Sequence, residues 1–171
     1  MKGVRYIENF LVESQGLYNK LKQAIIWDER MRARKTASFG VAYNYSQIQY
    51  PTQDFPNYLL ELISLIDKEL GFEPNNCIIN FYSNGDSKMG FHSDQTDILA
   101  VNTGVAIVSL GSTRTLRFRS VSEHTRIVDY PLASGSLLYM TQEVQLHWQH
   151  AIPREASADG RMSLNFRNIV S

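Results

Sequence analysis

Two side chains that could hold a metal ion lie two residues apart near the middle of the chain. His92 and Asp94 end a stretch, residues 80–94, whose pattern predicts a strand, a turn rich in Gly and Asn, and a second short strand. Because residues i and i+2 of a strand point to the same face, both side chains can reach one point in space. An imidazole and a carboxylate are two of the three ligands of the 2-His-1-carboxylate triad, which suits Fe(II) and oxidising reactions. The pattern predicts a metal centre that needs one more histidine.

Three other histidines could supply that ligand. His124 lies in a charged turn, where we expect it to be exposed. His147 and His150 lie in the segment 146–153, and a period of two places them on opposite faces, so that at most one of them faces the metal. The spacing alone leaves this choice open.

Two arginines near the C-terminus indicate an anionic ligand. Arg161 and Arg167 are six residues apart and point the same way on a predicted strand. Buried guanidinium groups are costly to leave unpaired, and they bind carboxylates through two parallel hydrogen bonds. A dicarboxylate such as 2-oxoglutarate fits this pair. The alternative is that both arginines pair with Asp or Glu at the surface.

The other elements are predicted as helices first and strands afterwards. Apolar spacing predicts a short strand or entry loop over 4–10, a helix over 14–27 with Ser14 as N-cap, and a helix over 59–70, which follows Pro56 and is ended by Gly71. Strands are predicted over 77–82, 104–110, 115–119, 125–129, 136–140 and 162–167. This order indicates an α+β fold with a jelly-roll (double-stranded β-helix) core and the N-terminal helices packed on one side. We predict one domain over 1–171, with the catalytic core at 75–171.

Composition and charge narrow the functional classes. The 171 residues carry 17 basic and 17 acidic side chains, so no global field draws the protein to a polyanion or an anionic membrane. The single cysteine, Cys77, excludes an internal disulfide and fits a reducing compartment, and we expect it to be buried and inert. No signal peptide or membrane span is recognisable. We expect a soluble, cytoplasmic monomer without an obligate protein partner.

A basic and aromatic segment precedes the second helix. Arg34 closes a short run of charges, and Tyr43, Tyr45 and Tyr50 follow it. Cations beside aromatic rings are suited to phosphate contact and base stacking. The equally weighted alternative is a solvated charge run followed by tyrosines that pack a β-hairpin.

The ordered motifs resemble AlkB-type Fe(II)- and 2-oxoglutarate-dependent dioxygenases. The resembling segments are 6–11, the helix ending at Trp27, 80–85, 92–94, 109–111, 135–138, 148–153 and 161–167, which together span nearly the whole chain. The resemblance implies that the metal ligands are His92, Asp94 and His150, that the residues holding 2-oxoglutarate are Asn80, Tyr82, Arg161, Asn165 and Arg167, and that Arg167 lies near the carboxylate that chelates the iron. It implies Fe(II), 2-oxoglutarate and O2 as cofactor and co-substrates, with ascorbate helpful in vitro.

The resemblance also implies a nucleotide-recognition lid at about 28–50. Its substrate contacts would be Arg34, Tyr43, Tyr45 and Ser46, together with Asp97, and Tyr45 would stack on a flipped base while Arg34 contacts phosphate. Many members carry an acidic residue where this chain has Thr96, and residues 28–32 lack an aromatic wedge that would hold a duplex open. Single-stranded nucleic acid is therefore favoured over a duplex, because unstacking a base costs less there.

Three functions are compatible with these residues. The first is oxidative demethylation of N-alkylated bases in DNA or RNA, which the full motif set and the lid favour. The second is the same chemistry on a small molecule or a protein side chain, which the neutral charge and Thr96 favour. The third, a non-catalytic binding module, is disfavoured because all three ligand positions and both arginines are present.

Overall fold

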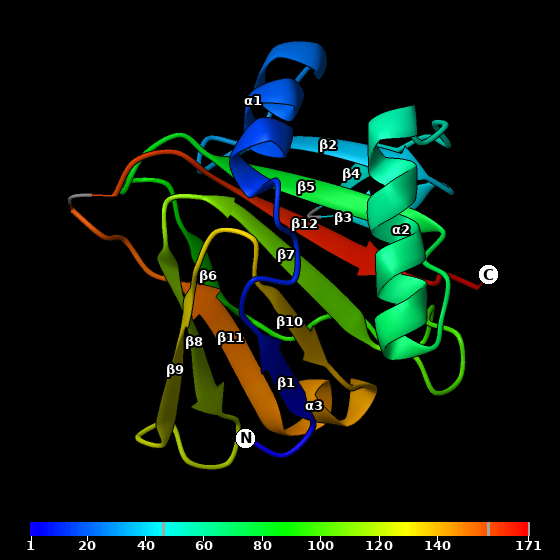
Figure 1. The fold of residues 1–171 in the computed structure, drawn as a ribbon. Helices are drawn as coiled ribbons and strands as arrows, with labels where there is room; N and C mark the ends of the chain where they lie inside the picture. The colour runs from blue at the N-terminus through cyan, green and yellow to red at the C-terminus, as the bar shows by residue number, and fades with distance from the viewer. Residues whose placement is uncertain (46, 157, 171) are drawn as a thin grey trace.

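The fold is two facing antiparallel sheets with two helices on one side (Figure 1). It is a computed structural model that describes residues 1–45, 47–156 and 158–170. In chain order the elements are β1 (Val4–Ile7), α1 (Ser14–Ala24), β2 (Lys35–Gly40), β3 (Tyr43–Tyr45), β4 (Ile48–Tyr50), α2 (Asn57–Leu70), β5 (Asn76–Tyr82), β6 (Met89–His92), β7 (Val105–Gly111), β8 (Arg114–Ser120), β9 (Ile127–Leu132), β10 (Leu137–Met140), α3 (Gln142–His147), β11 (Trp148–Ile152) and β12 (Arg161–Arg167).

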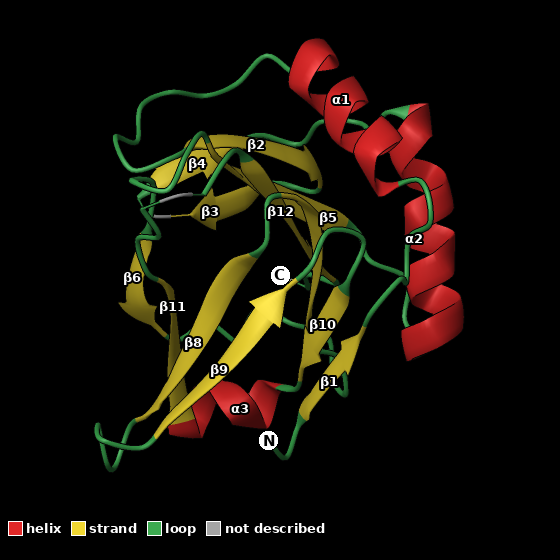
Figure 2. Ribbon diagram, turned by 60° about the vertical axis from the view of Figure 1, so that its left-hand side comes forward, coloured by secondary structure: helices red, strands yellow, loops and turns green. Residues whose placement is uncertain are grey.

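The sheet topology is that of a jelly roll. The larger sheet has the order β1-β10-β7-β12-β5-β2, the smaller has the order β6-β11-β8-β9, and β3 and β4 form a separate hairpin. Helices α1 and α2 cover the face of the larger sheet that points away from the smaller one, as both views show (Figures 1 and 2). The α+β jelly roll with N-terminal helices on one side is therefore confirmed.

The central strands of the larger sheet are buried on both faces and divide their side chains between two environments. On β12, Met162, Leu164 and Phe166 join the core under the helices. The alternate residues line a cavity between the sheets; they are Arg161, Ser163, Asn165 and Arg167. Strand β5 repeats the division, because Ile79 and Phe81 contact the helix-side core while Asn80 and Tyr82 line the cavity. The period of two thus supplies one hydrophobic core and one polar site from the same strands.

The two main helices end differently from each other. Helix α2 ends at Leu70, and Gly71 adopts the left-handed conformation (φ 78°), as predicted. The prediction that α1 extends to Trp27 is wrong: it ends at Ala24, and Ile25 is extended. Trp27 instead packs on Phe81 with ring centroids 5.2 Å apart. The predicted N-cap is also wrong, because Glu13 occupies that position, and no side chain among the described residues forms a capping hydrogen bond.

Two local predictions around the metal centre need correction. Strand β6 ends at His92, so Asp94 lies in the following loop, where its backbone N–H donates to Gln145 Oε1 at 2.8 Å instead of to a neighbouring strand. Residues 142–147 form α3, which the strand pattern did not predict. His147 is the last residue of that helix, so it and His150 do not share one strand.

The segments predicted as lid and core are interleaved in the fold. Within 28–50, β2 is an edge strand of the larger sheet, and only Tyr43–Tyr45 and Ile48–Tyr50 pair as the β3–β4 hairpin. Strand β1 also joins the larger sheet by pairing with β10. The domain limits stay a prediction. Within the described residues, no helix combines the length and apolar character needed to cross a membrane.

Candidate metal centre and co-substrate pocket

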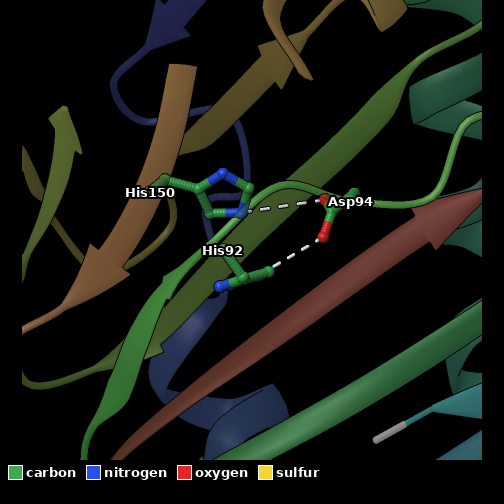
Figure 3. Close-up of side chains that lie close together, drawn as sticks. All are labelled: His92, Asp94 and His150. Carbon is green, nitrogen blue, oxygen red and sulfur yellow. Dashed lines mark ion pairs between the residues drawn. The ribbon is translucent and has the colours of Figure 1, made fainter. Parts of the chain in front are cut away.

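Two histidines on neighbouring strands of the smaller sheet lie side by side and line the cavity between the sheets. His92 on β6 and His150 on β11 are direct cross-strand partners, and their ring centroids are 4.3 Å apart. Asp94 lies beside both: His92 Nε2 is 3.3 Å from Oδ1 and His150 Nε2 is 3.7 Å from Oδ2 (Figure 3). One donor atom from each of the three residues lies within 4.8 Å of the others. His147 is exposed at the end of α3, and His124 is exposed as predicted.

Hydrogen bonds outside the triad orient two of its members. Gly90 O lies 2.9 Å from His92 Nδ1, which directs Nε2 toward Asp94. Gln145, which is 6% exposed, holds the Asp94 backbone from α3. Such outer contacts fix the orientation of metal-binding side chains.

The charges of the triad favour a bound cation. Burial would raise the pKa of Asp94, but the Arg167 guanidinium, at 3.4 Å, and the two imidazoles hold it well below its usual range. Burial lowers the pKa of His150 to about 4, and the Asp94 charge offsets only part of this effect. Burial would also lower the pKa of His92, but its hydrogen bond to Asp94 and the charge of that carboxylate outweigh burial and raise it. At neutral pH the site therefore offers an ionised carboxylate and a neutral His150, both in the forms that bind metals.

Arg161 carries a buried charge that requires an anion. Its side chain is fully buried and donates from Nη2 to Ser109 Oγ at 2.8 Å. Its Nε and Nη1 have no hydrogen-bond partner among the described residues, which also offer it no carboxylate within 4.0 Å. Burial lowers its pKa to about 10. An unpaired buried guanidinium is unfavourable, so this position fits one carboxylate of a dicarboxylate ligand.

Arg167 lies at the other end of the same cavity, next to the triad. Besides its ion pair with Asp94, its guanidinium lies 5.2 Å from the Tyr43 ring centroid, and its Nε and Nη1 lack partners among the described residues. Free donors thus remain at both ends of β12. With the His-Asp-His donor set, the residues present fit Fe(II) and a dicarboxylate.

The remaining residues predicted to hold 2-oxoglutarate also line this cavity. Burial raises the pKa of Tyr82 to about 12, so its hydroxyl stays a donor at neutral pH. Asn80, two residues before Tyr82 on β5, is 2% exposed and lines the same cavity. Asn165 is less available, because its Nδ2 donates to Ile78 O at 3.0 Å and to Ser163 O at 3.1 Å.

The predicted substrate contacts occupy different places. Tyr43 and Tyr45 stack on each other with centroids 6.2 Å apart, as expected for side chains on one face of a strand. Tyr45 is half-buried and borders both the inner cavity and an outer recess of about 400 Å³ that also includes His92. Asp97 is exposed and lines neither space. Ser46 lies outside the described residues, and these substrate roles stay predictions.

Three supporting residues were given no role in the site from the sequence. Gln145 lies in α3, which had no clear sequence signal. Ser109 could have been found, because alternation along 105–111 places it on the cavity side of β7 with Ile107. Arg114 is fully buried and donates to three backbone carbonyls, Asn84 O, Ser87 O and Pro153 O, which ties the β5–β6 loop to the end of β11.

Comparison with known sequences gives a consistent picture. The model of the 2OG-Fe(II) oxygenase superfamily matches residues 3–167. The alpha-ketoglutarate-dependent dioxygenase alkB homolog 3 of Rattus norvegicus is 30% identical over 179 residues, covering 93% of this chain and 61% of the rat protein. The DNA oxidative demethylase ALKBH2 of Homo sapiens is 32% identical over 148 residues, covering 80% of this chain and 57% of the human protein. The chain thus spans about three fifths of the length of these curated relatives.

Solved structures show the same fold at low sequence identity. The structure titled OsALKBH1 superposes with a TM-score of 0.73 at 17% identity, over 98% of this chain and 99% of that chain. A prolyl-4-hydroxylase of Pseudomonas putida gives a TM-score of 0.60, also at 17% identity, over 97% and 92% of the two chains.

Proposed function

Because the chain belongs to the 2OG-Fe(II) oxygenase superfamily and is AlkB-like within it, we propose that it oxidatively demethylates N-alkylated bases in single-stranded nucleic acid. The cofactor and co-substrates of this superfamily are Fe(II), 2-oxoglutarate and O2. The observation that carries the proposal is the joint presence of the His92–Asp94–His150 cluster and the two buried arginines in one cavity.

The metal ligands, the two arginines and the apolar wall of the cavity have separate tasks in this proposal. His92, Asp94 and His150 hold Fe(II), Arg161 and Tyr82 bind the distal carboxylate of 2-oxoglutarate, and Arg167 stabilises the carboxylate nearer the metal. When bound, the iron and its co-substrates supply oxidation of a C–H bond coupled to conversion of 2-oxoglutarate to succinate and CO2. Arg167 also keeps Asp94 ionised. The apolar walls, which include Ile107, Leu116 and Leu132, exclude water from this chemistry.

The outer recess supports a base as substrate. Tyr45 borders it on one side and His92 on another, so a planar ring could enter beside the metal centre. Base–aromatic stacking contributes about 1–3 kcal/mol per base. An N-methyl group hydroxylated there would leave as formaldehyde, which restores the base. The names of the curated relatives, a dioxygenase and a DNA oxidative demethylase, support this substrate class.

Mass spectrometry of methylated oligonucleotides tests the proposal. Single strands carrying 1-methyladenine or 3-methylcytosine would be incubated with protein, Fe(II), ascorbate and 2-oxoglutarate. We expect loss of the methyl group with the unaltered protein and none with Asp94→Ala. Faster reaction on a duplex than on the single strand would contradict the strand preference.

A second candidate is the same oxidation of a small molecule or a protein side chain. The net charge of zero and the presence of Thr96 support it, because neither favours a nucleic-acid base in particular. Slow succinate formation without any oligonucleotide demethylation would favour this candidate. A steep loss of oligonucleotide affinity with salt would favour the nucleic-acid substrate.

A further inference from the structure

Arg34 bridges three segments at the mouth of the co-substrate cavity. It lies just before β2 and is partly buried. Its Nε donates to Asn80 Oδ1 at 3.0 Å, its Nη2 to Tyr45 OH at 2.8 Å and its Nη1 to Lys88 O at 3.3 Å. All three nitrogens of the guanidinium are thus directed to protein atoms. These hydrogen bonds use three of the five N–H groups of the guanidinium and fix it between the segments that they join.

The contacts of Arg34 determine how Asn80 presents its amide. Asn80 Oδ1 accepts from Arg34 and also from Tyr45 OH at 3.2 Å. Because Oδ1 accepts the hydrogen bonds from Arg34 and Tyr45, Nδ2, which is the only donor group of the carboxamide, points away from these two residues. Asn80 is 2% exposed, and no hydrogen bond from Nδ2 is found within the described part of the chain. That donor therefore faces the cavity that Arg161 and Tyr82 also line.

Tyr45 forms part of the wall of this cavity. The hydrogen bonds that Arg34 and Tyr45 donate to Asn80 Oδ1 therefore connect the position of that wall to the orientation of the Asn80 amide.

We propose that Arg34 is a positioning residue for 2-oxoglutarate, which acts by orienting Asn80 and holding Tyr45 and the β3–β4 hairpin over the cavity. This inference rests on the proposed use of 2-oxoglutarate but not on the proposed nucleic-acid substrate. Co-substrate binding and hairpin closure then favour each other, because both depend on one hydrogen-bond network. Since Tyr45 also borders the outer recess, closure over 2-oxoglutarate prepares the wall against which the substrate binds.

Binding of 2-oxoglutarate to the Mn(II)-loaded full chain, measured by calorimetry without nucleic acid, tests this role. Arg34→Met removes the charge and all three hydrogen bonds, whereas Arg34→Lys keeps the charge but loses the planar fork. We expect both variants to weaken 2-oxoglutarate binding about tenfold while leaving Mn(II) affinity unchanged. Arg32→Met, an exposed arginine of the same segment, is the matched control and should bind 2-oxoglutarate like the unaltered protein.

Tyr45→Phe provides a variant that preserves packing and removes only the hydroxyl. It should weaken 2-oxoglutarate binding severalfold, and the double variant with Arg34→Lys should lose less than the product of the two single effects. Unchanged 2-oxoglutarate affinity in Arg34→Lys overturns the positioning role. If the unaltered protein binds no 2-oxoglutarate, this inference and the proposed function both fail. Tenfold weaker binding in a protein that demethylates no oligonucleotide supports the positioning role and overturns only the substrate.

Discussion

At the scale of single residues, Asp94 connects the candidate metal centre to the candidate co-substrate pocket. It lies within 3.3 to 3.7 Å of His92, His150 and Arg167, and its ionisation depends on all three. One carboxylate therefore has two tasks: it is a candidate metal ligand, and it neutralises a guanidinium buried at 3% exposure.

Replacement of Asp94 by Ala should reveal both tasks. We expect loss of Mn(II) binding, because two histidines remain without the carboxylate. We also expect the free energy of unfolding to fall by about 3–5 kcal/mol, because Arg167 is left as a buried charge without its partner. Calorimetry and urea unfolding measure these effects. Asp67→Ala, which alters an exposed carboxylate on α2, is the control, and equal stability of the two variants would contradict the pairing.

Metal binding by these residues should depend on pH in a specific way. His92 has a raised pKa in the metal-free protein, so it must release a proton when a metal binds below that pKa. His150, with a pKa of about 4, is already neutral near pH 6. Mn(II) affinity should therefore rise as pH increases through the pKa of His92 and then level off.

Calorimetry in buffers of different ionisation enthalpy counts the protons released. At about pH 6 the unperturbed pKa of histidine would allow partial release from both rings. The shifts described here predict release of at most one proton, from His92. Release of nearly two would show that His150 titrates in the same range and that its burial does not lower its pKa.

At the scale of elements, β12 joins the hydrophobic core to the polar site. Its seven residues are all buried, but alternate side chains contact the helices or the cavity. The strand pairs with β5 and β7 on its two edges, so its position depends on the core and not on a ligand.

Paired substitutions on β12 separate its two faces. Leu164→Ala on the helix side should lower the free energy of unfolding by about 2–5 kcal/mol, because it leaves a cavity in a closely packed core. Mn(II) affinity of the folded variant should stay unchanged. Ser163→Ala on the cavity side should change stability little. Urea unfolding and metal titration measure both, and a large loss of metal affinity in Leu164→Ala would contradict independent faces.

At the scale of the whole molecule, the two sheets enclose buried positive charge that a ligand should stabilise. Mn(II) with 2-oxoglutarate at about 100 times its dissociation constant should add about 2.7 kcal/mol to the free energy of unfolding. A chelator should reverse the gain that depends on the metal. Thermal and urea unfolding with and without each component measure this linkage.

Arg161→Met is the matched variant for this prediction. It removes a buried charge that lacks a carboxylate partner among the described residues, so the ligand-free variant should be as stable as the unaltered protein or more stable. It should gain little from 2-oxoglutarate while still binding Mn(II). An equal gain in both proteins would show that Arg161 does not contact the co-substrate.

Much of the site was already determined by local patterns in the sequence. The spacing of Arg161 and Arg167 gives this pair a shared direction because extended chain repeats every two residues. His92 and Asp94 also lie together as predicted, although Asp94 is in the loop after β6 and not on the strand. The period of 3.6 and Gly71 likewise gave the second helix and its end. The end of α1 and the N-cap were not predictable, because contacts distant in sequence, such as that of Trp27 with Phe81, compete with local preference.

Only the tertiary structure distinguished His150 from His147 by position. The two histidines are three residues apart, but His147 is the last residue of α3 and His150 lies on β11. The pairing of β11 with β6 places His150 opposite His92. Tertiary contacts also gave Arg34 its partners: Asn80 is 46 residues away, and only the pairing of β2 with β5 brings them together. Local sequence determined which side chains share a face, whereas pairing between distant strands decided which of those faces meet, because register depends on the packing of the whole sheet.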